Sequence, residues 1–152
     1  MAAQLDYKYT TPSGVPGGKA DLSNTVVVSR HVADEDGKLK CGMAVKSGSE
    51  KGKTIVLEGT DFEGVLLNGG VTEMDMKGEP HILKGATVNV VTKGKVWVRL
   101  AENAKPKYGL PAYVVATGKD IGYFTTEKND NLDVNAVFIT EADDGIAVIE
   151  LK

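Results

Sequence analysis

The chain has 152 residues, of which 41% are hydrophobic and 26% are charged, and its formal net charge is -3. A chain of this length buries enough surface to fold without a disulfide or metal ion, and its charge gives no general attraction to nucleic acid or anionic membranes. Cys41 is the only cysteine, which excludes an internal disulfide, and no apolar run has membrane-spanning length.

Residues 1–23 are the first predicted element, an extended N-terminal arm. Two Pro and three Gly fall within the eight positions 11–18, which is typical of turns and linkers. Tyr7 and Tyr9 precede this stretch, and their spacing would place both rings on one face of an extended chain. We interpret the arm either as disordered or as a segment that docks on a neighbouring molecule. The start has no apolar signal-peptide core, so we expect synthesis in a cytoplasm.

Residues 24–152 are predicted to form a single all-β domain. Short apolar and β-branched segments alternate with Gly-rich turns, and no segment shows a sustained helical period. About eight or nine short strands indicate a small β-barrel or a jelly-roll-like sandwich. The predicted strands are 25–28, 41–45, 54–57, 62–67, 86–91, 95–100, 112–116, 136–140 and 146–151.

The two strands on either side of residues 92–94 are predicted to form a hairpin. A three-residue loop gives a register in which Val90 faces Val96 and Val88 faces Val98, so that one face is wholly apolar. Gly94 then fills the left-handed position of a bulge. In this register Trp97 lies on the opposite, outward face.

Trp97 is the only tryptophan, and the predicted register places it beside Val91 and between Lys95 and Arg99. Three interpretations remain open: the ring is covered by its own chain, binds a small ligand or sugar, or anchors a contact with another chain. A Trp flanked by cations is typical of interfaces. The candidate interface residues are Tyr7, Tyr9, Val91, Lys95, Trp97 and Arg99.

Charge is distributed unevenly along the sequence. Residues 77–107 carry seven basic and two acidic side chains, a net of +5, whereas residues 120–152 carry eight acidic and two basic side chains, a net of -6. These regions are either two solvated surfaces or complementary surfaces that join copies of the chain or bind another protein.

The residues that would carry chemistry do not form a recognisable site. His31 and His81 have no second ligand at metal-binding spacing, and Cys41 has no nucleophile motif. Residues 14–20 lack the spacing of a phosphate loop, and residues 129–140 lack the Gly and Glu that a calcium loop needs. We therefore predict no enzymatic activity, no catalytic residue, no metal site and no cofactor.

Six short segments, in this order and spacing, resemble the structural cement, or head decoration, proteins of tailed bacteriophages. They are Gly14–Leu22, Cys41–Gly48, Asp61–Val65, Lys93–Val98, Val134–Thr140 and Gly145–Leu151. The resemblance covers most of the chain from about Gly14 onward.

The resemblance implies a non-enzymatic protein that binds the outer surface of the head and stabilises contacts between major capsid protein subunits. It implies a location on the virion after synthesis in the bacterial host cytoplasm, and a homo-oligomer, with a trimer favoured over a dimer. No direct nucleic acid or membrane partner is expected. The alternative is a β-sandwich module that binds a glycan or host-surface ligand on a phage or bacterial particle.

Overall fold

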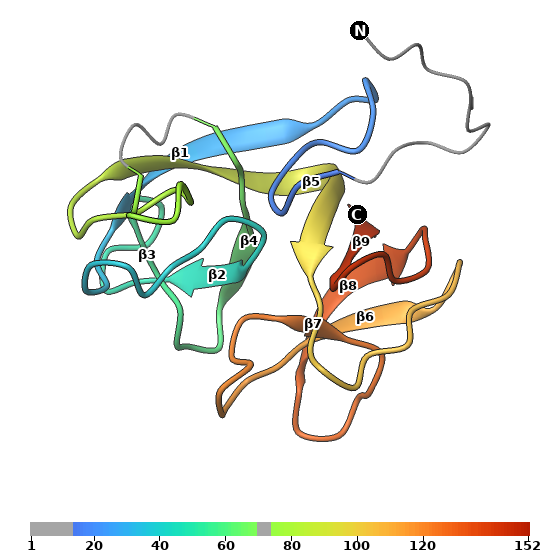
Figure 1. Cartoon of the computed structure of the whole chain (residues 1–152). Helices are drawn as coiled ribbons and strands as arrows, with labels where there is room; N and C mark the ends of the chain where they lie inside the picture. The colour runs from blue at the N-terminus through green and yellow to red at the C-terminus, as the bar shows by residue number, and fades with distance from the viewer. Residues whose placement is uncertain (1–13, 70–73) are drawn as a thin grey trace, which may run out of the picture.

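The computed structural model describes residues 14–69 and 74–152, and these residues form nine strands and no helix. The strands, labelled in Figure 1, are β1 (Val26–Val32), β2 (Ala44–Ser47), β3 (Thr54–Val56), β4 (Phe62–Leu66), β5 (Thr87–Arg99), β6 (Pro111–Val114), β7 (Phe124–Thr125), β8 (Leu132–Phe138) and β9 (Ile146–Leu151). The predicted all-β fold is confirmed.

Strands β1 to β5 form a closed five-stranded barrel, on the left in Figure 1. The order is β1-β3-β2-β4-β5, and β5 pairs again with β1, which leaves the barrel without a free edge. Only the β1–β3 pair is parallel. Apolar side chains from every strand fill the interior, including Val45, Ile55, Leu66 and Val90. Closure of this kind satisfies the backbone hydrogen bonds that an open sheet would expose.

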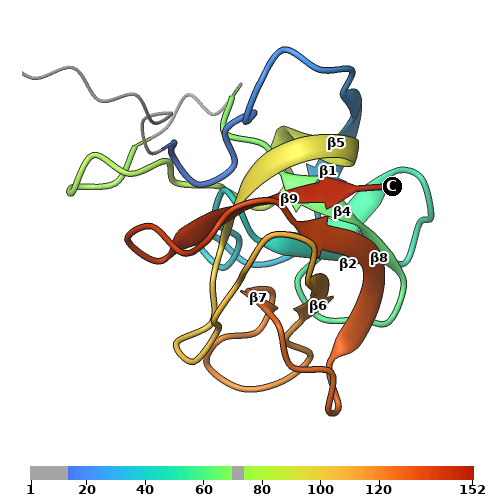
Figure 2. The same cartoon turned by 90° about the vertical axis from the view of Figure 1, so that its right-hand side faces the viewer.

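The second lobe continues from β5 in the order β5-β9-β8-β6-β7, and all of its strand pairs are antiparallel. A parallel bridge between Leu100 and Phe124 then returns β7 to the chain just after β5. Val96, Val98, Phe124 and Phe138 are fully buried within this lobe. Figure 2 shows these strands curling around one core.

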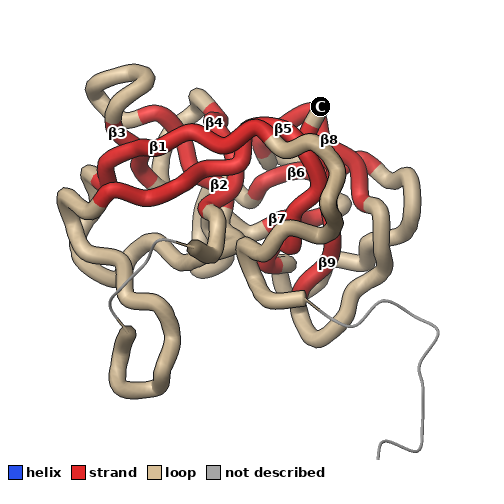
Figure 3. Tube along the Cα trace, turned by 90° about the horizontal axis from the view of Figure 1, so that it is seen from above, coloured by secondary structure: helices blue, strands red, loops and turns tan. Residues whose placement is uncertain are grey.

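The two lobes share a wall made by β2, β4 and β5. Because side chains alternate along a strand, neighbouring residues of this wall enter different cores. Val45, Leu66 and Val90 belong to the barrel core, whereas Ala44, Val65 and Val91 belong to the core of the second lobe, and all six are fully buried. Figure 3 shows both lobes from above, with β5 running from one into the other. A single sheet therefore separates the two cores and contributes side chains to both of them.

The predicted hairpin at residues 92–94 is wrong, because β5 runs through them as one continuous strand. Its first half pairs with β1 and β4, and its second half pairs with β9. Val91 pairs with Val27 and Lys93 with Val26, so Thr92 is the extra residue of a bulge. Gly94 has a positive φ of 124°, as expected, but at a bend between two sheets instead of in a loop.

The predicted apolar face of residues 96–100 is confirmed. Val96 and Val98 are fully buried, and Leu100 is 8% exposed. Their partners come from β9 and not from residues 86–91: Val96 pairs with Ile149, and Val98 with Ala147. The alternation of side chains thus predicted correctly which side chains point inward. The strand that pairs with them, β9, lies about 50 residues later in the sequence.

Candidate functional site: the N-terminal clasp on β5

Residues 14–20, which we call the N-terminal clasp, run along the edge of β5 that β9 leaves free. The amide of Gly17 donates to the carbonyl of Trp97 at 2.8 Å, and the amide of Trp97 donates to the carbonyl of Gly18 at 2.9 Å. Further along, the amide of Ala20 donates to the carbonyl of Lys95 at 3.2 Å. The clasp therefore adds one more extended segment to the sheet of the second lobe.

Gly17 fixes the clasp against the barrel as well. Its carbonyl accepts a hydrogen bond from the amide of Asn68 at 2.8 Å. Its φ is +79°, and a Cβ atom built on it would lie 2.6 Å from the carbonyl oxygen of Leu66. Only glycine combines this backbone conformation with such a close approach. The clasp is thus held between the barrel and the second lobe.

Trp97 is covered by its own chain and is only 8% exposed. Its indole packs with Ile146 and Val148 in a small outer cluster, to which the clasp residue Ala20 contributes. Gly14 lies directly against the ring, because a Cβ atom there would be 2.2 Å from the indole Nε1. The first of the three interpretations of Trp97 therefore describes its environment within the chain. Contact of Trp97 with another chain stays a prediction.

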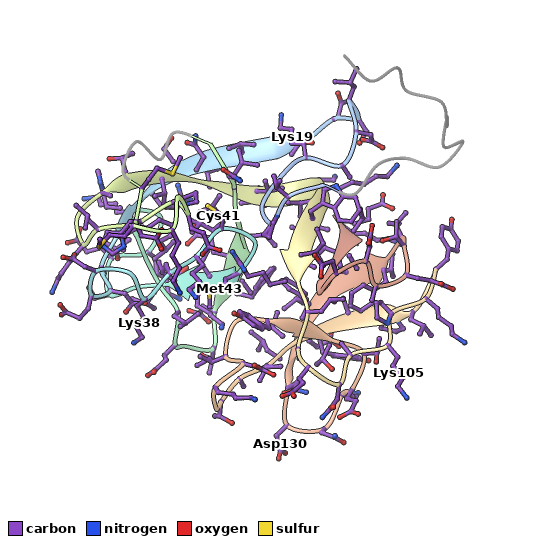
Figure 4. The ribbon with its side chains drawn as sticks, viewed as in Figure 1. Lys19, Lys38, Cys41, Met43, Lys105 and Asp130 are labelled. Atoms are coloured by element: carbon purple, nitrogen blue, oxygen red, sulfur yellow. The ribbon has the colours of Figure 1, made fainter. Side chains whose placement is uncertain are left out.

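The two cations beside Trp97 make contacts within the chain. The Nζ of Lys95 lies 3.3 Å from the Asp21 carboxylate, just after the clasp. Hydrogen bonds from the Ser23 hydroxyl and amide lower the pKa of Asp21 and keep it charged. Arg99 donates through its Nε to the carbonyl of Cys41 at 2.8 Å, and Figure 4 shows Cys41 in the middle of the molecule.

The structure brings together Lys95, Trp97 and Arg99, but it separates Val91 from them. Val91 is fully buried in the core of the second lobe, so its predicted position beside Trp97 on an outer face is wrong. The physical reason is the bulge at Thr92, which shifts the alternation of side chains between the two halves of β5. Tyr7 and Tyr9 lie outside the described residues.

The clasp itself was not predicted, because residues 11–18 have the composition of a linker. The available signal was the combination of Gly14 and Gly17 with Pro16 between them. Glycine is required where a backbone or an aromatic ring approaches closely, and both of these glycines meet such an approach.

Within residues 14–69 and 74–152, no cluster of three or more His, Cys, Asp or Glu side chains is arranged to hold a metal ion. Burial raises the pKa of the Cys41 thiol, which disfavours the reactive thiolate. Lys46 is buried and donates to the carbonyl of Leu57 at 2.8 Å, and burial lowers its pKa to about 8. In the same part of the chain, no helix is long and apolar enough to cross a membrane.

The chain matches one protein-family model and is similar to two solved structures. The family model described as "Structural cement protein (E217 gp24/Pam3 gp6)" matches residues 3–152. A chain from the solved structure "The capsid of Myoviridae Phage XM1" is 16% identical with a TM-score of 0.75, covering 100% of this chain and 98% of that one. A chain from "The crystal structure of head fiber gp8.5 N base in bacteriophage phi29" is 13% identical with a TM-score of 0.46, covering 85% and 95%. No curated protein sequence matches.

The likeness to the capsid chain of phage XM1 spans both lobes and shows that the fold is shared. The family model extends over nearly the whole length, from within the N-terminal arm to the last residue of the chain. A structural role in the phage capsid follows for the family as a whole. The chain therefore belongs to the phage structural cement protein family.

Proposed function

We propose that the protein binds the outer surface of the phage head and stabilises contacts between neighbouring major capsid protein subunits. The match of residues 3–152 to the structural cement family carries this proposal. The shared fold with a chain of the phage XM1 capsid supports it. The protein acts by binding alone and performs no chemical step.

Repetition on a shell makes modest contacts sufficient for this role. An interface of about 1,600 Å² has an affinity anywhere from micromolar to picomolar, depending on its anchoring residues. An oligomer that binds several capsid subunits at once gains further, because each later contact forms at a high effective concentration. We therefore expect a homo-oligomer that bridges capsid subunits.

The N-terminal arm is the proposed docking segment, and the clasp is its base. Gly14 lies against the Trp97 ring, so the point from which the arm is connected to the described chain is fixed. Tyr7 and Tyr9 supply aromatic side chains of the kind that anchor interfaces. In this proposal Trp97 and Lys95 act by holding the base of the arm, and Arg99 acts by fixing the loop beneath it.

Attachment of purified protein to undecorated phage heads tests the proposal. We expect saturable co-sedimentation by the full chain and at least tenfold weaker attachment after Tyr7→Ala/Tyr9→Ala. Gln4→Ala/Lys8→Ala is the matched control in the same segment and is expected to attach nearly as the wild type does. Failure of the full chain to attach to any heads would contradict the capsid role, whereas equal attachment by all three proteins would contradict only the role of the arm.

A further inference from the structure

A hollow of about 400 Å³ lies beside the N-terminal clasp. Its lining comes from segments that are distant in sequence: the clasp residues Val15 and Pro16, the loop that ends at the buried Cys41, and the exposed turn 75–81. Figure 4 labels Cys41 near the middle of the molecule. Arg99, the last residue of β5, also lines this space, which we call the Arg99 hollow.

The guanidinium of Arg99 is oriented by the loop beneath it. Its Nε donates to the carbonyl of Cys41 at 2.8 Å, and its backbone amide donates to the carbonyl of Gly42 at 3.1 Å. Its two Nη atoms make no hydrogen bond or ion pair within residues 14–69 and 74–152, and no buried side-chain nitrogen or oxygen of these residues lacks a partner. The Nη atoms are therefore open to solvent, and they form an oriented pair of charged donors.

Two more cations line the Arg99 hollow. Lys40 and Lys77 are exposed, and neither makes an ion pair within the part of the chain that the structure describes. The acidic residues of the lining are Asp75 and Glu79. Asp75 already accepts the backbone amides of Lys77 and Glu79 at 2.8 and 2.9 Å, so its carboxylate is engaged by its own turn. The hollow therefore holds more positive than negative charge.

A second hollow beside Arg99 has the opposite character. It shares Pro16 and Arg99 with the first, but its lining also includes the exposed Asp143 and Asp144 and contains no lysine. An anion is repelled by these two carboxylates and attracted by the lysines of the Arg99 hollow. The side of Arg99 that suits an anionic partner is therefore the side lined by Lys40 and Lys77.

We propose that the Arg99 hollow receives an acidic side chain, Asp or Glu, of the capsid protein to which the chain attaches. This inference rests on the proposed attachment to heads and adds the chemistry of one contact. A guanidinium binds a carboxylate through two parallel hydrogen bonds, which fixes the direction of approach. Lys40 and Lys77 add attraction without a fixed geometry. The contact thus sets the orientation of the partner as well as contributing affinity.

The hollow adjoins the base of the proposed docking arm. Val15, which lines the hollow, is 55% exposed and follows Gly14, the first described residue after the arm. A partner bound by the arm is therefore within reach of the hollow. The exposed Val15 side chain supplies an apolar rim, and apolar contacts that exclude water strengthen a charged pair at an interface.

Protection of Arg99 from an arginine-selective reagent tests the contact directly. The chain has two arginines, and Arg30 is an internal control because it is paired with Glu63. Free protein and protein attached to undecorated heads are treated with phenylglyoxal, and mass spectrometry measures the modification of each arginine. We expect Arg99 to react in the free protein and to be protected at least about fivefold on heads, because a bound partner excludes solvent, while Arg30 reacts equally in both.

Substitution tests the same contact through the affinity for heads. Arg99→Gln should weaken attachment at least about tenfold, and Lys40→Gln/Lys77→Gln at least about threefold. The lysine pair makes no ion pair within the described residues, so this variant should fold as the wild type does, and thermal melting checks all variants. Lys128→Gln/Lys152→Gln removes the same charge outside the lining of the hollow, and it should attach as the wild type does.

The outcomes separate this inference from the proposed function. Attachment of the wild type with Arg99 equally reactive on and off heads would overturn the inference and leave the attachment to heads intact. The same conclusion would follow from full attachment by a folded Arg99→Gln variant, or from a loss in Lys40→Gln/Lys77→Gln no larger than in the control. Failure of the wild type to attach to any heads would overturn both.

Discussion

The two lobes of the molecule close their sheets in different ways. The barrel closes on itself, because β5 pairs with β1 along Thr87–Lys93 and six residue pairs join the two strands. In the second lobe, the last strand, β7, meets the chain just after β5 through the bridge between Leu100 and Phe124. The edge of β5 that β9 leaves free is covered by the N-terminal clasp. The barrel needs no residue before β1 for its closure. The second lobe, in contrast, uses the base of the arm as part of its own sheet.

This difference makes the clasp, which is the base of the proposed docking arm, part of the sheet of the second lobe. The clasp is hydrogen-bonded to Trp97 and Lys95 of the second lobe, and Gly17 is also hydrogen-bonded to Asn68, which follows β4 of the barrel. The shared wall of β2, β4 and β5 then connects the second lobe to the barrel core. The variants below test how far the two lobes behave as separate units.

The largest expected effects come from the two cores. Phe124→Ala in the second lobe should lower the free energy of unfolding by about 3–5 kcal/mol, and Ile55→Ala in the barrel by about 2–5 kcal/mol, because both side chains are fully buried. Since the cores share a wall, each variant should shift one common transition in chemical denaturation. Two separate transitions would show that the lobes unfold independently.

Trp97→Ala should lower the free energy of unfolding by about 3 kcal/mol, because the ring is buried against the clasp. The loss should fall mainly on the second lobe, and hydrogen exchange is expected to accelerate at the amides of Gly17 and Trp97. A stability equal to that of the wild type would mean that the clasp contributes nothing to the fold.

A matched pair of glycines separates crowding in the clasp from backbone strain. Gly17 and Gly52 have nearly the same φ, +79° and +77°, but only Gly17 has backbone atoms within 4 Å of a built Cβ atom. Gly52→Ala should cost about 1 kcal/mol, and Gly17→Ala about 2–3 kcal/mol. Equal losses in thermal or chemical unfolding would contradict the close fit of the clasp between the lobes.

The one expected effect that depends on pH concerns Lys46, on β2 of the barrel. Its pKa is about 8 in the folded chain and 10.5 as the unperturbed value. Between these values the unfolded chain binds more protons, so the stability that depends on Lys46 rises as the pH increases. Relative to Lys46→Met, the wild type should gain about 2–3 kcal/mol between pH 7 and pH 10. An unchanged difference in the free energy of unfolding would contradict the lowered pKa.

The sequence was sufficient for most of the strands and for the inward face of residues 96–100, because alternation of side chains is a local property, but it missed β7 and divided β5 into two strands. It was insufficient for the path of β5. Thr92, Lys93 and Gly94 have the composition of a hairpin loop, yet Lys93 pairs with Val26 of a distant strand and Gly94 with Leu151. A local sequence pattern does not reveal such long-range partners. The bulge at Thr92 also changed the face of β5 on which Val91 lies.

The site was predicted in part for the same reason. The unusual position of Trp97 on the charged side of its strand was visible from alternation alone. What covers the ring was not visible, because the clasp lies about 80 residues earlier in the chain. Gly14 and Gly17 look like linker residues until the ring of Trp97 and the backbone of residues 66–68 are placed beside them.

The most direct test of the proposed cement role measures the stability of the phage head itself. Undecorated heads are heated in a calorimeter with and without a saturating amount of the purified protein, with Tyr7→Ala/Tyr9→Ala as the comparison. The proposal predicts that the wild-type protein raises the temperature at which the capsid subunits dissociate, because a ligand that binds only the assembled state stabilises it. An unchanged dissociation temperature at full occupancy would contradict the cement role.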